Sequence, residues 1–226
     1  MTQTIPPFYD KNMTCDICTH SFTTKKMRSR FIRVDQVEND FYKTYKDPLL
    51  NPLLYEAAVC PECGYSFTDS FLPVKKEELK EAFQNQVSSS WKKRDFGGER
   101  DYETALTIMK LTLLSAKVTS QPYGLMGSIC LRIAWLHRYQ EKSSEEARFL
   151  DQAAVQYEKS FLEGDFRDIA MSELALLFIL GECYRRTGNK EKARKYFSKV
   201  IEHKDKHLEP NLVERTREQW YETKAN

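Results

Sequence analysis

The sequence predicts a mainly α-helical protein in which a stack of helical hairpins follows a small N-terminal module of β-strands. From Arg100 onward, apolar residues recur at helical spacing in successive segments that are separated by short breaks. Before Ser70 the chain instead shows short apolar runs, prolines and two closely spaced cysteine pairs. We therefore expect a module over residues 1–72, a linker helix and turn over 73–98, and a helical domain over 99–226.

The composition is that of a folded, nearly neutral protein. The chain has 226 residues, of which 41% are hydrophobic and 30% are charged, and its formal net charge is +2. This balance argues against a disordered chain. Residues 1–70 carry 8 basic and 9 acidic side chains. Nothing in the charge therefore favours nucleic acid or an anionic membrane as a partner.

We expect the protein to be located in the cytoplasm. The first residues show no basic segment followed by an apolar stretch, which is the pattern of a secretory signal. The longest apolar run, Leu174–Leu180, is far shorter than a membrane-spanning helix. Paired cysteines in a reducing compartment are more typical of metal ligands than of disulfides.

Short patterns predict the first elements of the chain. Arg30–Val34 alternates as a strand does, and Leu53–Val59 is a second strand candidate that leads into a cysteine pair. Pro48 and Pro52 predict an irregular connection between them, because the residue before a proline is pushed out of helical geometry. After these, Leu79-x3-Phe83-x3-Val87 predicts the linker helix.

Four cysteines fall into two pairs of the same form, Cys15-x2-Cys18 and Cys60-x2-Cys63. A gap of two residues lets both sulfurs of a pair face one ion, and Gly64 leaves room for backbone N–H groups to face a thiolate. Four thiolates suit a tetrahedral site for a soft metal. The long segment between the pairs is expected to form an inserted hairpin or loop.

One structural zinc ion is the cofactor that this pattern favours, in a module of the zinc-ribbon type. Iron held by four thiolates is a less favoured alternative, and a redox-active thiol pair is another. A site closed by four thiolates leaves no position for water or substrate, so we expect it to be structural rather than catalytic.

One segment of the helical region follows a repeat pattern. It reads Leu177-x2-Leu180-Gly181-x2-Tyr184-x3-Gly188-x4-Ala193-x3-Phe197, with small residues where two helices would cross and large ones beside the crossing. The segment resembles the tetratricopeptide family. A weaker copy precedes it, with Ala134 and Ala153 in the small positions. The last helix, through Trp220, is expected to cap the stack.

The tetratricopeptide resemblance implies a groove formed by the first helix of each hairpin. The family's inward positions correspond here to six partner-binding candidates: Trp135, Arg138, Tyr139, Glu182, Arg185 and Arg186. Arg138 and Arg185 fall at equivalent positions. Because a guanidinium offers a planar fork of donors, we expect this pair to hold a carboxylate from an acidic segment of a protein or peptide partner.

Several runs together resemble one bacterial family, the domain-of-unknown-function family 2225. They are the first C-x2-C pair, Asn51-Pro52-Leu53-Leu54-Tyr55, Val59-Cys60-Pro61-x-Cys63-Gly64-Tyr65, Leu131-Arg132-Ile133-Ala134-Trp135-Leu136, and Arg217-x2-Trp220. The resemblance implies a cytoplasmic protein of Gram-positive bacteria with no established activity.

The function that we expect is that of a non-enzymatic adaptor, because the sequence lacks the phosphate-binding glycine loops and the hydrolase and metalloprotease motifs. Two alternatives stay open. One is a zinc ribbon that binds nucleic acid and dimerises through its helices. The other is a redox sensor whose zinc is released when its thiolates are oxidised. The sequence leaves the oligomeric state open.

Overall fold

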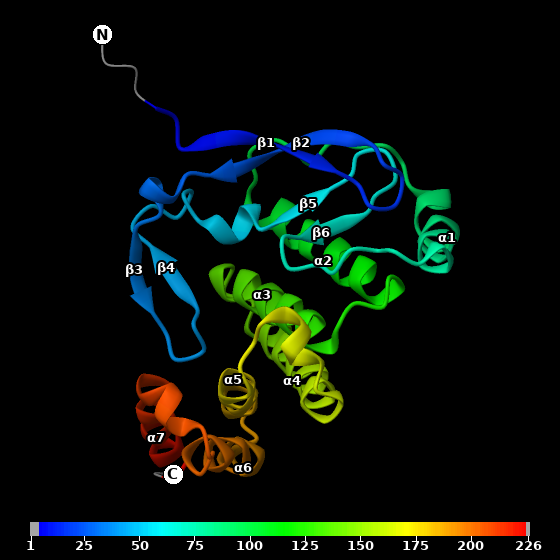
Figure 1. Ribbon diagram of the computed structural model, residues 1–226. Helices are drawn as coiled ribbons and strands as arrows, with labels where there is room; N and C mark the ends of the chain where they lie inside the picture. Colours follow the sequence, from blue (N-terminus) through cyan, green and yellow to red (C-terminus); the bar gives the residue numbers. More distant parts are fainter. Residues whose placement is uncertain (1–4, 225–226) are drawn as a thin grey trace. The chain divides into compact units, whose positions relative to one another are not determined.

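The computed structural model describes residues 5–224 and divides into two compact units (Figure 1). The first unit comprises residues 5–37 and 43–121, and the second comprises residues 38–42 and 122–224. Among the described residues there are seven α-helices and six short strands, with all of the strands before residue 69. The predicted class, mainly α with a small N-terminal β module, is therefore confirmed. Residues 1–4 and 225–226, at the ends of the predicted domains, lie outside the described range.

The strands of the first unit form three antiparallel pairs: β1 (Phe8–Thr14) with β2 (Ser21–Met27), β3 (Val34–Val37) with β4 (Lys43–Tyr45), and β5 (Ala57–Val59) with β6 (Ser66–Thr68). A cysteine pair lies in the connection of the first hairpin and another in that of the third. The second hairpin is the insertion that the distance between the cysteine pairs required.

The predicted strands were only partly right. Arg30–Val34 is wrong as a strand, because Ser29–Phe31 forms a 3₁₀ turn and β3 begins only at Val34. Within the second candidate, Pro52–Tyr55 is also a 3₁₀ turn, and the Asn51 side chain accepts a hydrogen bond from the Leu53 N–H at 3.0 Å. Asparagine followed by proline favours a capped turn over an extended strand.

Two helices complete the first unit. The linker helix α1 (Glu77–Gln86) lies where its spacing predicted it and buries Phe83 completely. Helix α2 (Tyr102–Val118) packs against β5 and β6. The buried Ser66 hydroxyl lies 2.7 Å from the Thr112 hydroxyl, and the Ser66 N–H donates to Ser115 Oγ at 3.0 Å. These bonds place α2 in the first unit, whereas the sequence assigned it to the helical domain over 99–226.

Arg100 is a buried connector within the first unit that sequence reasoning missed. Its guanidinium donates to the carbonyl oxygens of Leu54 and Ala57 at 3.1 and 2.7 Å, and to the Thr24 hydroxyl at 2.9 Å. Burial lowers the pKa of Arg100 to about 10. One side chain therefore joins β2 to the turn and strand that precede the second cysteine pair.

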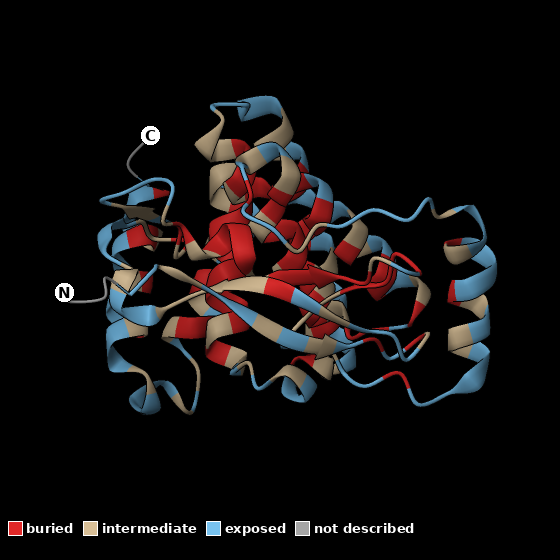
Figure 2. Ribbon diagram, turned by 90° about the horizontal axis from the view of Figure 1, so that it is seen from above, coloured by how far each residue is buried: buried red, intermediate tan, exposed pale blue. Residues whose placement is uncertain are grey.

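The second unit consists of five helices in sequence: α3 (Tyr123–Tyr139), α4 (Ser143–Glu163), α5 (Glu173–Arg186), α6 (Lys190–Ile201) and α7 (Pro210–Glu222). Each helix packs on the next, and α7 also packs on α5. Ten of the fourteen residues of α5 are buried, so this helix forms the centre of the unit. Buried residues run along the inward faces of the helices, whereas the β1–β2 ribbon of the first unit is mostly intermediate or exposed (Figure 2).

Small residues mark where paired helices approach closely. A Cβ atom on Gly181 of α5 would overlap the ring of Phe197 on α6, as the repeat pattern predicted. In the preceding hairpin the close approach is at Gly127 of α3, where a Cβ would lie 2.7 Å from the ring of Tyr157 on α4. The sequence had pointed to Ala134 as a small position of this hairpin, and Ala134 is fully buried.

Candidate metal centre and arginine cluster

The two cysteine pairs lie in turns of the same backbone geometry. In the first, the Cys15 N–H donates to the His20 carbonyl at 3.0 Å and the Thr19 N–H donates to the Cys15 carbonyl at 2.9 Å. The second repeats both bonds, with Cys60 N–H to the Tyr65 carbonyl at 2.8 Å and Gly64 N–H to the Cys60 carbonyl at 3.0 Å. The chain thus builds one turn twice.

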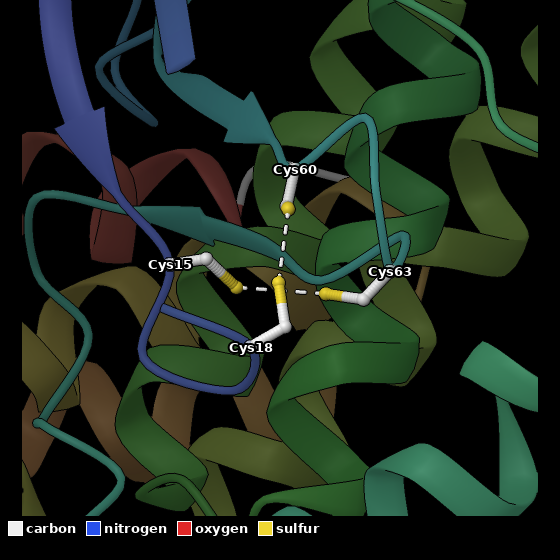
Figure 3. Close-up of side chains that lie close together, drawn as sticks. All are labelled: Cys15, Cys18, Cys60 and Cys63. Carbon is white, nitrogen blue, oxygen red and sulfur yellow. Dashed lines mark hydrogen bonds between the residues drawn. The ribbon is translucent and has the colours of Figure 1, made fainter. Parts of the chain in front are cut away.

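The turns bring their four sulfurs together (Figure 3). The Cys15 and Cys63 sulfurs are 3.5 Å apart, and those of Cys18 and Cys60 are 3.6 Å apart, so each close contact joins the two turns. All four sulfurs lie within 4.8 Å of one another. Cys15, Cys60 and Cys63 are buried, and Cys18 is partly exposed.

The spacing fits a tetrahedral ion. A metal that binds four thiolates at about 2.3 Å holds their sulfurs about 3.8 Å apart. The close contacts at 3.5 and 3.6 Å and the 4.8 Å limit bracket that value. All six cysteines are free thiols, so no disulfide competes for these sulfurs. The four residues can therefore hold a metal ion, as their sequence spacing predicted.

The electrostatics of the cluster call for a cation. Hydrogen bonds from the Cys15 and Cys63 thiols lower the pKa of Cys60, so one thiolate forms readily. Hydrogen bonds to neighbouring cysteine sulfurs raise the pKa values of the Cys15 and Cys63 thiols, so the four sulfurs do not all ionise without a cation. A bound cation reverses this effect, because it attracts every sulfur at once.

The cluster is enclosed by a small apolar core. Around the cysteines lie five buried apolar residues, namely Ile17, Tyr65, Val74, Phe83 and Val87. Phe83 and Val87 come from α1 and the turn that follows it, which explains why the linker helix belongs to this unit. A site with four sulfur ligands inside such a core has no open coordination position, and this is the arrangement of a structural metal site.

The two turns carry different residues at the position where both need a left-handed backbone. Gly64 adopts φ +79°, and a Cβ there would lie 2.6 Å from the ring of Trp91, whose indole N–H donates to the Pro61 carbonyl at 3.0 Å. The equivalent residue of the first turn is Thr19, at φ 60°. A β-branched residue in this region is strained. Its hydroxyl donates to the Cys18 carbonyl at 2.7 Å, which offsets part of that strain.

A second polar cluster lies in the second unit and involves several of the predicted partner-binding residues. Arg138, near the end of α3, and Arg186, the last residue of α5, both face the carboxylate of Asp40. Arg138 Nη2 lies 2.7 Å from Asp40 Oδ2, and Arg186 Nε lies 3.1 Å from the same oxygen. Both arginines also pair with Glu38, and the Trp135 indole N–H donates to Asp40 at 3.2 Å.

The carboxylate that fills this site comes from the chain itself. Asp40 belongs to the segment Glu38–Tyr42, which connects β3 to β4 and is part of the second unit. Burial alone would raise the pKa of the fully buried Asp40, but the hydrogen bond and charge of Arg138, together with Arg186, hold it below its usual range. Asp40 is therefore a stable anion between two cations.

The remaining predicted partner-binding residues surround this ion cluster. Arg185, which the sequence placed opposite Arg138, instead pairs with Glu182 of its own helix at 2.9 Å, and Arg186 takes the expected place. Glu182 is fully buried, and burial raises its pKa against the opposing effect of Arg185. The ring of Tyr139 lies 4.8 Å from that of Tyr42. Arg138 is further held by Glu146 at 2.7 Å.

The segment Glu38–Tyr42 was missed by the sequence analysis. Its partners lie about a hundred residues away or more along the chain, and no local pattern reports such contacts. One signal was present: two acids and two aromatic residues stand together in Glu38-Asn39-Asp40-Phe41-Tyr42, in a connection predicted to be irregular. Such a composition is unusual for a turn that lies only in solvent.

In the part of the chain that the structure describes, no helix combines the length and the apolar character needed to cross a membrane.

Comparison with known proteins places the chain in a family. Neither the comparison with curated proteins nor that with solved structures gives a significant match. One family model matches residues 8–223, which includes both cysteine pairs and the whole helical region. The chain belongs to this family, DUF2225, described as an uncharacterized protein conserved in bacteria.

Proposed function

We propose that this protein is a non-enzymatic cytoplasmic adaptor with a zinc-stabilised first unit and a helical second unit that binds an acidic segment of a protein partner. The observation that carries the proposal is the convergence of Arg138 and Arg186, from two different helices, on a single carboxylate oxygen. A site that selects one carboxylate with two guanidinium groups and an indole N–H is specific for an acidic side chain.

Zinc is the metal that we assign to the first unit. Four cysteine thiolates in a closed, largely buried cluster are the donor set of structural zinc sites. Iron is the competing ion for a four-thiolate site. The two are separated by metal analysis together with a visible spectrum, because Zn²⁺ has a filled d shell and its thiolate complex is colourless, whereas the iron complex absorbs visible light.

Crosslinking followed by affinity purification from the native host tests the adaptor role. The double variant Arg138→Ala/Arg186→Ala removes both cations. Arg148→Ala is a matched control, since Arg148 is an exposed arginine of the same unit and forms an ion pair with its helical neighbour Glu145. We expect the wild type and Arg148→Ala to recover the same partner in equal yield, and the double variant to recover at least tenfold less.

The double variant is informative only if it is folded, which circular dichroism and a thermal melt of each protein establish. Equal recovery of the partner by the folded double variant and the wild type would remove the arginine pair from the proposed function. A recovered partner that has no acidic segment would do so as well.

A further inference from the structure

The site at Arg138 and Arg186 is occupied by a peptide that the chain itself supplies. Within Glu38–Tyr42, hereafter the tip, Asp40 has no exposed surface and Tyr42 is 6% exposed. The strand before the tip, Val34–Val37, is exposed at every residue. Burial in this hairpin is therefore concentrated in the five residues that belong to the second unit.

The backbone of the tip is closed on itself. The Glu38 N–H donates to the Tyr42 carbonyl at 2.8 Å, and the Phe41 N–H donates to the Glu38 carbonyl at 3.0 Å. The Tyr42 N–H donates to Asp40 Oδ1 at 3.3 Å. Phe41 takes a left-handed conformation, with φ 66°. Because these backbone bonds lie inside the tip, the tip contacts the helices through its side chains. The side chains of another peptide can replace these contacts.

The side chains of the tip define what the site recognises. The Asp40 carboxylate faces the two guanidinium groups and accepts a hydrogen bond from the indole N–H of Trp135, and Glu38 pairs with the same two arginines. The aromatic residues lie beside it. The Tyr42 ring is 4.8 Å from that of Tyr139, and the Phe41 ring is 5.5 Å from that of Phe178. The site therefore recognises, in sequence order from Glu38 to Tyr42, an acidic residue, a spacer, an aspartate and two aromatic residues.

The charges of the site favour an acidic peptide once the tip has left. With the tip in place, the cluster holds four carboxylates (Glu38, Asp40, Glu146 and Glu182) and three arginines (Arg138, Arg185 and Arg186). The formal sum is one negative charge. Removal of Glu38 and Asp40 leaves the three arginines with two carboxylates and one positive charge. Arg215, whose guanidinium lies 5.4 Å from the Phe41 ring, adds one more cation beside the site in both states. An acidic peptide is therefore attracted more strongly to the vacated site than to the occupied one.

We propose that the tip is an internal competitor, which closes the peptide site of the second unit until a partner segment of the same chemistry displaces it. This inference rests on the proposed function, and it adds the recognition order and the regulation of that function. Because the tip is tethered at both ends, its effective concentration at the site is on the order of millimolar. A partner with a single short segment competes poorly with it, and a partner that makes further contacts competes well.

Peptide binding to a protein without the tip tests this proposal. Residues 38–42 are replaced by Asn-Gly, which closes a two-residue hairpin turn and exposes the arginines to water rather than leaving them buried and unpaired. The probe is a fluorescent peptide of residues 36–44, cyclised through added terminal cysteines so that it keeps a turn. Fluorescence anisotropy measures its binding to the wild type and to the variant.

We expect the tip-replaced protein to bind the cyclic peptide at least tenfold more tightly than the wild type does. A peptide in which the residue corresponding to Asp40 is asparagine should bind the same variant at least tenfold more weakly. Equal affinity of the wild type and the tip-replaced protein for the peptide would overturn the proposal. So would the absence of binding to a tip-replaced protein that is folded.

A milder variant decides the matter if the replacement prevents folding. Glu38→Gln removes the carboxylate whose side chain is 40% exposed and leaves Asp40 between the arginines. It should bind the peptide about threefold more tightly than the wild type, and an unchanged affinity would overturn the proposal. If the wild type and the tip-replaced protein recover the same partner in equal yield, the adaptor role is supported and the role of the tip as a competitor is rejected. If the tip-replaced protein binds the peptide but no partner with an acidic segment is recovered, the tip is supported as a competitor and the adaptor role is rejected.

Discussion

The cysteine cluster of the first unit and the arginine cluster of the second each crowd like charges into a partly buried space. Four sulfurs lie within 4.8 Å of one another, and all four can be thiolates together only when a cation is bound among them. Arg138 and Arg186 meet around one oxygen, and their positive charge is neutralised by Glu38 and Asp40 of the same chain. The cysteine cluster would take its counter-charge from a bound metal ion, whereas the arginine cluster takes its counter-charge from carboxylates of the same chain.

This difference determines how each cluster responds to change. A site completed by an external ion is coupled to metal concentration and to chelators, because binding free energy is folding free energy there. A site completed by the chain's own carboxylates is coupled to the position of one short segment and to competing acids. The predictions below separate the two kinds of coupling.

The largest effect is expected from Cys60→Ser, which removes one of the four sulfurs. Structural zinc contributes about 10–16 kcal/mol of apparent binding free energy in small metal-binding peptides, so loss of the ion should unfold the first unit. Metal analysis should find no zinc in this variant, and limited proteolysis should cut within residues 5–37. Cys130→Ala, in the core of the second unit, is the control and should keep its metal. A metal-bound, protease-resistant Cys60→Ser protein would contradict the account.

The next effect is expected from Asp40→Asn, which leaves two partly buried arginines without their shared anion. Removal of one partner from a buried ion pair costs about 3–5 kcal/mol, and we expect the lower end because Glu38 stays in place. Urea denaturation of the second unit measures the loss. Glu38→Gln is the control: its side chain is 40% exposed, so the cost should be below about 1 kcal/mol. Equal losses for the two variants would mean that Asp40 is not the central anion.

The two cysteine turns allow a matched pair of smaller changes. Gly64→Ala adds a Cβ at φ +79°, against the Trp91 ring, and should destabilise the first unit by about 2 kcal/mol. Thr19→Gly, at the equivalent position, relieves a left-handed threonine and should stabilise the unit by up to about 1 kcal/mol. Thermal melts of the metal-bound protein measure both. Shifts of the same sign would show that the turns are not equivalent.

The smallest effect is expected from acid. Because the pKa of Asp40 in the folded protein is below its ordinary value of 3.8, this group stabilises the second unit above about pH 4, and the contribution is lost as the pH falls further. Urea midpoints measured between pH 5 and pH 3 should fall more steeply for the wild type than for Asp40→Asn. Parallel curves would remove Asp40 as the acid-sensitive group.

Local features were predictable from the sequence, and long-range ones were not. The spacing within each cysteine pair lets its two sulfurs face one ion, and the pattern around Gly181 and Phe197 fixes a helix crossing, because both depend on residues close in sequence. The strands β1 and β2 escaped notice because they form an exposed ribbon without regular apolar alternation. The place of α2 depends on buried hydroxyl groups of Thr112 and Ser115 that any helix can carry.

The arginine cluster shows the same limit. The tetratricopeptide resemblance drew attention to Arg138 and Arg186, but a family pattern describes positions on a helix and not what lies against them. Arg186, rather than Arg185, faces Asp40 together with Arg138, and Arg185 pairs with Glu182 of its own helix. The occupying segment, Glu38–Tyr42, comes from an insertion between two cysteine pairs.

The most direct test compares the response of the two units to a chelator. Native mass spectrometry of the purified protein should show one zinc ion per chain, and a strong chelator should remove it. Hydrogen exchange should then rise throughout residues 5–37 while the helices of residues 122–224 and the segment 38–42 keep their protection. A chain that carries no ion, or whose first unit keeps its protection after chelation, would contradict the claim that an external cation completes the cysteine cluster.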